Sequence, residues 1–306
     1  MLKRFISLLL LVLVTFTAFA VSGCAPSPSP IAPSVILQEG NNLPKTQLQP
    51  KQSRELADNR IGGLWSGLSQ TTPADLQEIL NEGISGGGLK WVRLAINTGD
   101  GDMVDWDLPE FSVQPAHDKW ITDIADNDVT IMYMLSFWDK ANWPRELHQS
   151  RFKTEEDIQR YLDFVRFTVH HFNDRVQYFE IWNEPNCGEA CIEPKECLQY
   201  IEVDDYVNLV KRTVPVIRQE YPEAKIVVGA IPGLWEPKGR EYLFSILKSD
   251  IMPPVDAISW HPMYGISPEQ RREYYYNYPS LAQEIKDVAS AHGFKGEYIA
   301  EELGWM

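Results

Sequence analysis

The chain has 306 residues, of which 44% are hydrophobic and 23% are charged, a composition that supports at least one sizeable folded core. Its 43 acidic residues against 28 Lys and Arg residues give a net charge of −15 at neutral pH. Such an excess of negative charge disfavours binding to nucleic acid phosphates and to the anionic surface of a membrane. We therefore expect no nucleic acid partner, and a neutral or cationic ligand instead.

The first 23 residues have the pattern of an export signal. Lys3 and Arg4 precede an apolar run that ends in small residues directly before Cys24. This ending resembles a bacterial lipobox, which implies that residues 1–23 are a lipoprotein signal peptide and that Cys24 is lipidated. We therefore expect an exported protein, lipid-anchored to the cell envelope, that contacts the membrane only through this anchor. The alternative is an N-terminal membrane helix with an incidental cysteine.

Residues 24–57 form the next segment, which is rich in Pro, Ser and Gln and has no sustained apolar period. This composition is typical of a flexible linker. Residues 58–306 therefore remain for the folded domain.

Seven short runs with a high content of β-branched and aromatic residues follow this linker. They alternate with amphipathic stretches, and their starts lie about 30–50 residues apart, which leaves room for a crossover helix in each gap. The predicted strands are residues 61–68, 89–96, 129–136, 176–182, 225–230, 255–260 and 297–302.

The stretches between the strands carry helix signals. Thr72 and Thr154 each stand at an N-cap position with an acidic residue three positions later. The segment after Thr154 keeps a helical apolar period as far as Val169, and residues 204–219 and 280–292 keep the same period. This strict alternation of strands and helices predicts a parallel sheet with right-handed crossovers.

The alternation favours an α/β fold of the (β/α)8 TIM barrel type over a doubly wound sheet. No Gly-rich phosphate loop follows the first strand, because Gly62 and Gly63 lie inside it and residues 86–88 precede the second strand. A TIM barrel has eight strands in about 250 residues. Met306 comes just after the seventh predicted strand. We therefore expect an incomplete barrel of about seven βα units, with the eighth strand missing and the chain truncated at its C-terminus.

Acidic motifs end the fourth and the seventh predicted strands, where a TIM barrel carries its reactive groups. The fourth strand leads into Asn-Glu-Pro at 183–185, and the seventh leads into Glu-Leu-Gly-Trp at 302–305. In this strand order, the two motifs resemble the two signatures of the retaining glycoside hydrolases of clan A, a group of cellulase-like and β-xylosidase-like TIM-barrel enzymes. The resemblance spans roughly residues 58–306.

The resemblance implies that Glu184 is the general acid/base and Glu302 the nucleophile of a double displacement. Cleavage with retention needs two carboxyl groups about 5–5.5 Å apart, and strands four and seven face each other across a barrel mouth. Glu301 and Glu302 are adjacent, so the nucleophile is a choice between them. With a period of two, we expect Glu302 to share the inward side of its strand with Ala300 and Tyr298, and Glu301 to face the helix layer or a loop.

Two further residues would serve this pair according to the resemblance. Asn183 matches the residue that hydrogen-bonds the sugar 2-hydroxyl, although it could instead cap the turn before Pro185. Arg93 matches the second-strand arginine that supports the nucleophile, and a bidentate cation suits that role. Its alternative is a buried ion pair with Glu180, deeper in the barrel, and the two roles are compatible.

Aromatic residues and one histidine complete the predicted sugar site. The resemblance implies that Tyr264 hydrogen-bonds the nucleophile and that His261 lines a sugar subsite, although a histidine before proline could simply cap backbone groups. Trp138 and Trp305 follow strand ends. Flat rings can stack on the apolar faces of sugars, so we interpret both as sugar platforms, with core packing as the alternative.

Three cysteines follow the acid/base motif. In an exported protein we expect Cys187, Cys191 and Cys197 to form one disulfide and leave one cysteine over, with the pairing open. A zinc site of three thiolates has no nearby histidine in this loop, so we expect no metal and no cofactor.

The leading hypothesis is a lipid-anchored retaining β-glycoside hydrolase that cleaves a β-linked poly- or oligosaccharide, of a β-xylosidase-like, β-glucanase-like or β-mannanase-like kind. The alternative is a non-catalytic sugar-binding surface lipoprotein on the same barrel, although such a binder would not need both carboxylates. A third hypothesis is a barrel fragment without activity. Because of the missing strand, we expect residues 1–306 alone to be weakly active or inert.

Overall fold

The computed structural model describes residues 60, 62–66, 81, 88–95, 104–105, 111–136, 150–186, 200–262 and 267–302. The predicted signal peptide, the linker with Cys24 and the helix predicted after Thr72 lie outside these residues. Within the ranges given, no helix has both the length and the apolar character that a membrane span requires.

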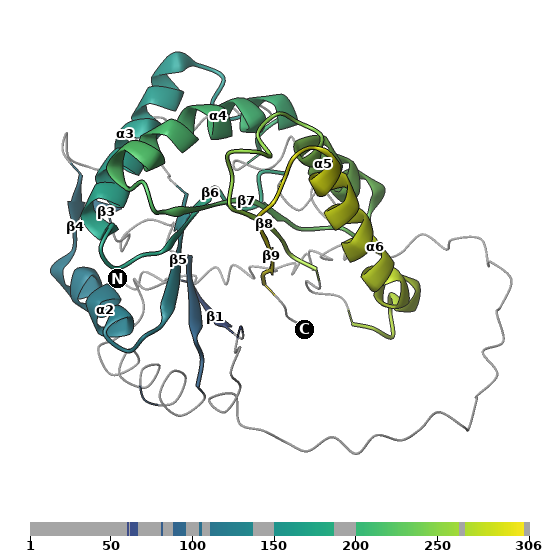
Figure 1. Ribbon diagram of the computed structural model, residues 1–306, viewed down its shortest axis with the longest axis horizontal. Coiled ribbons are helices and arrows are strands. Elements are labelled where there is room, and N and C mark those ends of the chain that lie inside the picture. Colours follow the sequence, from purple (N-terminus) through teal and green to yellow (C-terminus); the bar gives the residue numbers. More distant parts are fainter. Residues whose placement is uncertain are drawn as a thin grey trace, which may run out of the picture. The chain divides into compact units, whose positions relative to one another are not determined.

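The central feature is a sheet of seven parallel strands whose spatial order is the order of the chain. Figure 1 shows this sheet curling inside an arc of helices. Such an order, with a helix after most strands, is the arrangement of a TIM barrel, as the sequence predicts. The strands are β1 (Gly62–Ser66), β2 (Trp91–Ala95), β5 (Thr130–Leu135), β6 (Tyr178–Ile181), β7 (Lys225–Ile231), β8 (Ala257–Trp260) and β9 (Glu297–Ala300).

Five helices lie in the described ranges, together with a short antiparallel pair of strands that the sequence patterns do not predict. Thr154 caps the first turn of α3 as expected, because its side chain accepts a hydrogen bond from the backbone N–H of Asp157. Helix α6 begins earlier than predicted and continues through Pro279. The elements are β3 (Val104–Asp105), β4 (Ser112–Val113), α2 (Pro115–Ala125), α3 (Glu155–Phe172), α4 (Val203–Glu220), α5 (Pro237–Leu247) and α6 (Arg272–Ala291).

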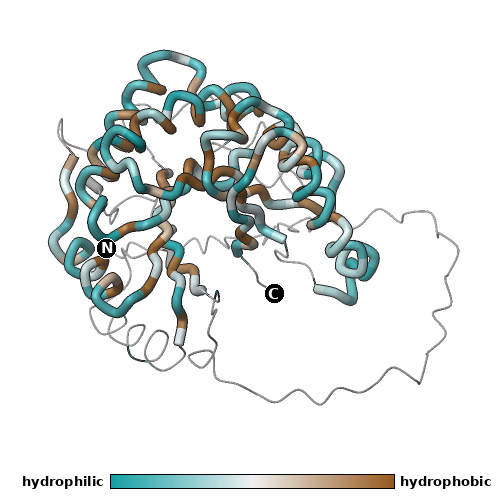
Figure 2. Tube along the Cα trace, in the orientation of Figure 1, coloured by the Kyte–Doolittle hydropathy of each residue, from teal (hydrophilic) through white to brown (hydrophobic). Residues whose placement is uncertain are grey.

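The two faces of the sheet differ in chemistry. The outward face packs against the helices in a large apolar core, to which Phe179 and Ile181 of β6 belong. Figure 2 shows hydrophobic residues concentrated along the strands and hydrophilic residues prominent on the surrounding helices. The inward face has a small apolar cluster, with Tyr178 among its members, and Glu180 lies fully buried one step farther along the same face. Strand alternation therefore places an acidic layer above an apolar one inside the barrel.

Candidate active site

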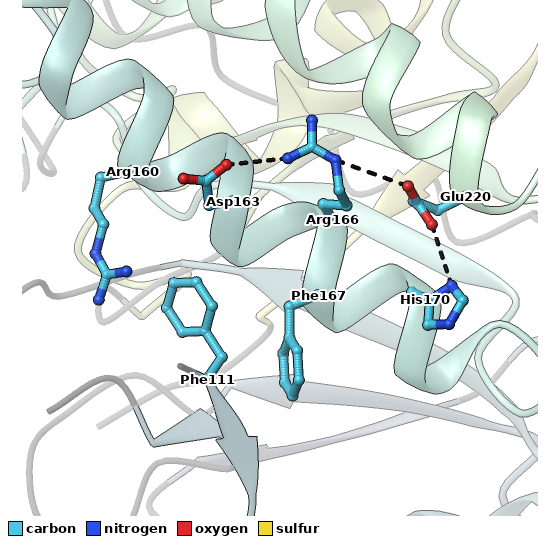
Figure 3. A pocket seen from close by; sticks show the side chains of 7 residues that line it. All are labelled: Phe111, Arg160, Asp163, Arg166, Phe167, His170 and Glu220. Atoms are coloured by element: carbon cyan, nitrogen blue, oxygen red, sulfur yellow. Dashed lines mark hydrogen bonds and ion pairs between the residues drawn. The ribbon is translucent and has the colours of Figure 1, made fainter. Parts of the chain in front are cut away.

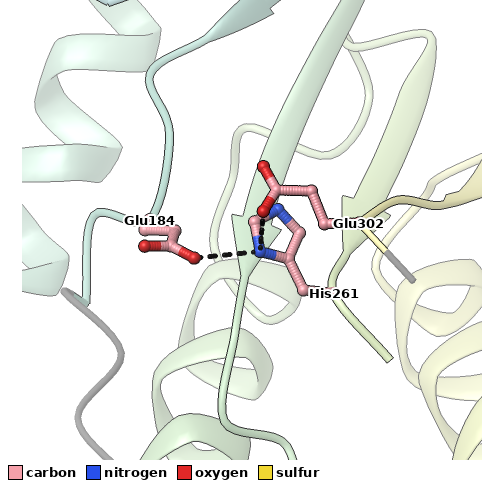
Figure 4. Close-up of side chains that lie close together, drawn as sticks. All are labelled: Glu184, His261 and Glu302. Atoms are coloured by element: carbon pink, nitrogen blue, oxygen red, sulfur yellow. Dashed lines mark hydrogen bonds and ion pairs between the residues drawn. The ribbon is translucent and has the colours of Figure 1, made fainter. Parts of the chain in front are cut away.

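Glu184 and Glu302 lie at one end of the barrel, beyond the C-terminal ends of β6 and β9. One carboxylate oxygen of each, together with a ring nitrogen of His261, lies within 4.8 Å of the other two atoms. Figure 4 shows the three side chains converging from separate segments, with the imidazole beside both carboxylates. Both acids are partly accessible, since 23% of the Glu184 side chain and 12% of the Glu302 side chain are exposed. A ligand can therefore reach the pair.

The backbone bends sharply where these acids are carried. Trp182, Glu184, Ala230 and Glu302 adopt positive φ angles of 68°, 48°, 50° and 37°, which residues with a side chain rarely adopt. The bend after β6 is held by the Glu184 N–H, which donates to the Ala230 carbonyl at 3.2 Å. Strained backbone of this kind concentrates at functional sites, where surrounding structure enforces it.

Arg93 connects the site to the barrel interior. Its guanidinium donates to Glu180 at 2.6 and 2.8 Å, to Glu302 at 2.5 Å and to the side-chain oxygen of Asn183 at 2.8 Å. Burial lowers the pKa of Arg93, but the charges of Glu180, Glu301 and Glu302 outweigh burial and raise the pKa above its ordinary value. The sequence left two roles for Arg93, a contact with Glu302 and a buried ion pair with Glu180. The structure shows both contacts together.

Glu180 anchors this arginine from below. Its second oxygen accepts a hydrogen bond from Ser259 at 2.8 Å, and Ser259 in turn accepts one from the Ala230 N–H at 2.9 Å. Burial raises the pKa of Glu180 to about 8, even though Arg93 opposes this shift. Ser259 was not predicted as a site residue; the available signal was a hydroxyl on the inward side of an otherwise apolar strand.

The prediction for the side chain of Glu301 is wrong. Its carboxylate faces the barrel interior, where it lies 3.3 Å from Arg93 Nε and 3.5 Å from His261 Nε2. The Glu301 N–H continues the parallel ladder by donating to the Trp260 carbonyl at 2.9 Å, so Glu301 keeps the alternation of β9. That alternation has Glu297 inward, where it accepts from the Tyr178 hydroxyl.

The expected inward position of Tyr298 is also wrong. Its hydroxyl donates to the Lys286 carbonyl of α6 at 3.3 Å, so the ring lies on the helix side of the sheet. Glu302 therefore does not reach the site by alternation from Tyr298 and Ala300. It reaches the site because the chain turns at its own positive φ, after β9 has ended.

His261 is a buried cation between the acids. Its Nδ1 lies 3.1 Å from Glu184 Oε1 and 3.6 Å from Glu302 Oε2, and its side chain is fully buried. Burial lowers the pKa of His261, but the hydrogen bond with Glu184 and the nearby carboxylates of Glu301 and Glu302 outweigh burial and raise it to about 9. The imidazole is therefore protonated at neutral pH.

The same three side chains could surround one metal ion by geometry alone. A metal ion bound there would have to displace the proton of the His261 imidazole. Arg93 already neutralises Glu302. The charges present fit a site for proton transfer better than a metal site.

Several predicted site residues lie outside the described residues. These are Tyr264, Trp138, Trp305 and the cysteines Cys187, Cys191 and Cys197. Their roles stay predictions.

A separate hollow of about 460 Å³ lies on the helical side of the molecule, between α3, the end of α4 and the residue before β4. Figure 3 shows Phe111 and Phe167 at its floor and charged side chains at its edge. Charged side chains at its edge pair with one another, since Arg166 lies 3.0 Å from Asp163 and 3.8 Å from Glu220. None of its lining residues belongs to the carboxylate cluster.

No family model and no curated protein sequence matches the chain. Solved structures do match. A family 39 glycoside hydrolase from Bacteroides cellulosilyticus WH2 is 16% identical, with 76% of this chain and 46% of that chain covered and a TM-score of 0.55. An endo-1,4-beta-mannanase from Rhizomucor miehei is 16% identical, with 79% and 76% covered and a TM-score of 0.56. The endo-1,4-beta-D-mannanase from Thermotoga petrophila RKU-1 is 15% identical, with 80% and 87% covered and a TM-score of 0.51.

This chain thus spans less than half the length of the family 39 structure. At these identities the similarity concerns the fold, and it confirms the fold class predicted from the sequence. The chain has the TIM-barrel fold of these glycoside hydrolases.

Proposed function

We propose that the chain is a retaining β-glycoside hydrolase that cleaves the O-glycosidic bonds of a β-linked poly- or oligosaccharide. The observation that carries this proposal is the approach of Glu184 and Glu302, whose nearest oxygens lie within 4.8 Å. Retaining enzymes hold their two carboxyl groups about 5–5.5 Å apart, whereas inverting enzymes need about 6.5–9.5 Å for an intervening water. The spacing supports direct attack by one acid.

In the first step, the Glu302 carboxylate attacks the anomeric carbon while Glu184 donates its proton to the leaving oxygen. The products are a covalent glycosyl ester on Glu302 and the released aglycone. In the second step, Glu184 takes a proton from a water molecule, whose oxygen attacks the anomeric carbon and releases Glu302. No cofactor takes part in either step.

The surrounding residues support these roles. Arg93 donates to Glu302 and fixes the direction of the attacking carboxylate. His261 occupies Oε1 of Glu184, which leaves the other oxygen to carry the proton toward the leaving group. Arg93 also fixes the amide of Asn183, which we propose donates to the sugar 2-hydroxyl.

Glu302 serves better than Glu301 as the nucleophile. Only 1% of the Glu301 side chain is exposed, and its carboxylate contacts Arg93 and His261 from below. Glu302 is the more accessible of the two and the one grouped with Glu184. An attacking group must reach the substrate, so the greater accessibility of Glu302 supports it as the nucleophile.

The remaining parts of the proposal come from the sequence. We propose that Tyr264 hydrogen-bonds Glu302 and that Trp138 and Trp305 stack on sugar rings, whereas the fully buried His261 acts on the sugar subsite through Glu184. We also propose export through residues 1–23 and lipid anchoring at Cys24. Two of the structural neighbours are endo-1,4-beta-mannanases, which supports testing β-linked polysaccharides first.

The test is hydrolysis of aryl β-glycosides and plant polysaccharides by the 306-residue chain and by any longer natural polypeptide that contains it. We expect Glu184→Gln to lower the rate on unactivated substrates about 100-fold or more. We expect Glu302→Gln to lower it about 10⁴-fold or more. The matched control is Glu241→Gln, an exposed acid on α5, which should keep the wild-type rate.

Azide rescue separates the two adjacent acids. With azide, Glu302→Ala should release a glycosyl azide of inverted configuration, because azide enters the space of the removed nucleophile. If Glu302→Gln keeps a near-normal rate, or if azide rescues only Glu301→Ala, the assigned roles are wrong. Binding of a polysaccharide without hydrolysis by either polypeptide would instead indicate a sugar-binding protein.

A further inference from the structure

Glu301 is a buried acid that the proposed chemistry does not consume. Its side chain is 1% exposed, and its carboxylate lies 3.3 Å from Arg93 Nε and 3.5 Å from His261 Nε2. A carboxylate so deeply buried is costly unless cations compensate its charge. Here the two compensating cations are the same two that contact the proposed catalytic pair.

Each of these cations has one side toward Glu301 and another toward the cleft. Arg93 contacts Glu301 through Nε and Glu302 through an outer nitrogen. His261 contacts Glu301 through Nε2 and Glu184 through Nδ1. One buried carboxylate thus lies behind both of the cations that hold the reacting carboxylates.

We propose that Glu301 is a positioning residue, whose buried carboxylate holds Arg93 and the imidazolium of His261 in place and thereby fixes the geometry of Glu302 and Glu184. This inference rests on the proposed glycosidase reaction for its catalytic consequence. Its structural part, the control of His261 by Glu301, stands on the contacts alone.

The charge balance of the cluster explains why a carboxylate is needed at this position. His261 faces three acids, Glu184, Glu301 and Glu302, and no hydrogen bond from Arg93 reaches it within the described residues. Without Glu301, the Nε2 side of this fully buried ring loses the carboxylate that lies 3.5 Å away. The ring then keeps its proton less tightly, because burial alone favours neutral imidazole.

Loss of the His261 proton would change the hydrogen bond between His261 and Glu184. A neutral His261 has one N–H, and the ring could then accept a hydrogen bond at Nδ1 instead of donating one to Glu184. The proton of Glu184 would turn toward the ring and away from the leaving oxygen. The positioning role therefore predicts a loss of rate as His261 deprotonates.

Glu180 is the second buried acid in the barrel interior, beside Glu301, and its ionisation also affects the net charge of the cluster. Burial raises the pKa of Glu301, but Arg93 and His261 outweigh burial and lower it to about 2, whereas burial raises the pKa of Glu180 to about 8. The ionisations of these two buried acids are coupled, and burial and Arg93 act on them in opposite directions. Glu301 is the member that carries the charge next to His261.

The experiment compares Glu301→Gln with the wild-type chain by two readouts. The first is the NMR titration of His261 in histidine-labelled protein, assigned through a His261→Asn variant. Removing the neighbouring charge should lower the titration midpoint by about one unit or more. The second is the pH profile of kcat/KM, whose basic limb should shift to lower pH together with the His261 midpoint. We also expect kcat to fall about 10- to 100-fold while KM changes little.

Two further variants control for structural damage. Glu297→Gln makes the same change on the same strand, where the acid contacts Tyr178 instead, and should leave both readouts unchanged. Glu301→Asp keeps the negative charge, so the titration midpoint of His261 in this variant should lie close to the wild-type value. An unchanged midpoint in Glu301→Gln, or equal shifts in Glu301→Gln and Glu297→Gln, overturns the proposal.

The two readouts also separate this inference from the proposed function. If the wild-type chain hydrolyses nothing but the midpoint moves as expected, the positioning of His261 stands and the glycosidase function fails. If hydrolysis is normal and the midpoint does not move, the function stands and the role of Glu301 is wrong.

Discussion

Raising the pH from 6.5 to about 9.5 should destabilise the fold because it removes the proton from buried His261. The folded-state pKa of His261 is raised from 6.5 to about 9, because the hydrogen bond with Glu184 and the nearby Glu301 carboxylate outweigh burial. A group with a raised folded-state pKa stabilises the fold fully below its unfolded pKa, and this stabilisation is lost as the pH rises through the folded value. The difference corresponds to about 3 kcal/mol of unfolding free energy.

The measurement is urea unfolding at a series of pH values for the wild-type chain and for His261→Gln. Glu180, whose pKa is raised to about 8, also loses stabilisation as the pH rises, so the wild-type slope alone does not isolate His261. The variant keeps the other titrating groups, and the wild type should lose about 3 kcal/mol more than His261→Gln over this interval.

A matched histidine keeps this test specific. His292 is exposed at the C-terminal end of α6, so His292→Gln should show the same pH dependence of stability as the wild type. If His261→Gln loses as much stability as the wild type between pH 6.5 and about 9.5, the buried imidazolium is not held by its carboxylates and the electrostatic reasoning fails.

Two substitutions test the support around the site. Arg93→Lys keeps the positive charge, but a lysine cannot bond Glu180 and Glu302 at once, so kcat/KM should fall about 100-fold. A value of kcat/KM within threefold of the wild type would show that the charge alone suffices. Gly229→Ala should cost about 2–4 kcal/mol in urea unfolding, because a Cβ there meets a main-chain oxygen of β8 at 2.1 Å at a φ of +127°. Gly293→Ala is its control, because it shares the positive φ but meets its nearest atom at 3.3 Å, and equal costs would contradict the steric argument.

The order of the strands in the sheet could be predicted from the sequence because the same strand pattern recurs along the chain. Each strand of the barrel is buried on both faces and reads as a short apolar run between amphipathic helices. The boundaries differ by a few residues because the predicted runs extend into the loops. Helix α6 was predicted to start at 280, after Pro279, yet it starts at Arg272, since buried Tyr274 ties its first turns to the core.

The positions of the acids at the strand ends were predicted only in part. For Glu180, simple alternation along β6 places the side chain correctly inside the barrel. For β9 the same rule was counted back from Glu302, and it reversed the inward and outward sides of Glu301 and Tyr298. A positive φ at a non-glycine residue has no sequence signal of its own, because tertiary contacts enforce it.

The two proposed catalytic acids are placed by one common device. Each follows a strand end, each has a positive φ, and each is held by a buried cation, Arg93 for Glu302 and His261 for Glu184. Arg93 lies within β2, and His261 follows β8 directly, with its N–H bonded to the Ile231 carbonyl at 3.0 Å. The cations are thus fixed by the sheet itself.

Because strand residues hold the two acids, the loops that follow the strands are free to vary. Beneath the ionic layer, the inward face of the sheet carries a small apolar cluster that includes Met132 and Val227, and apolar surroundings strengthen the interaction between nearby charges. The distance between the carboxylates then depends on strand residues and on the buried Glu180 and Glu301. The loops above the strand ends can change the ligand that is bound without moving the reacting pair, which is how one barrel supports many substrates.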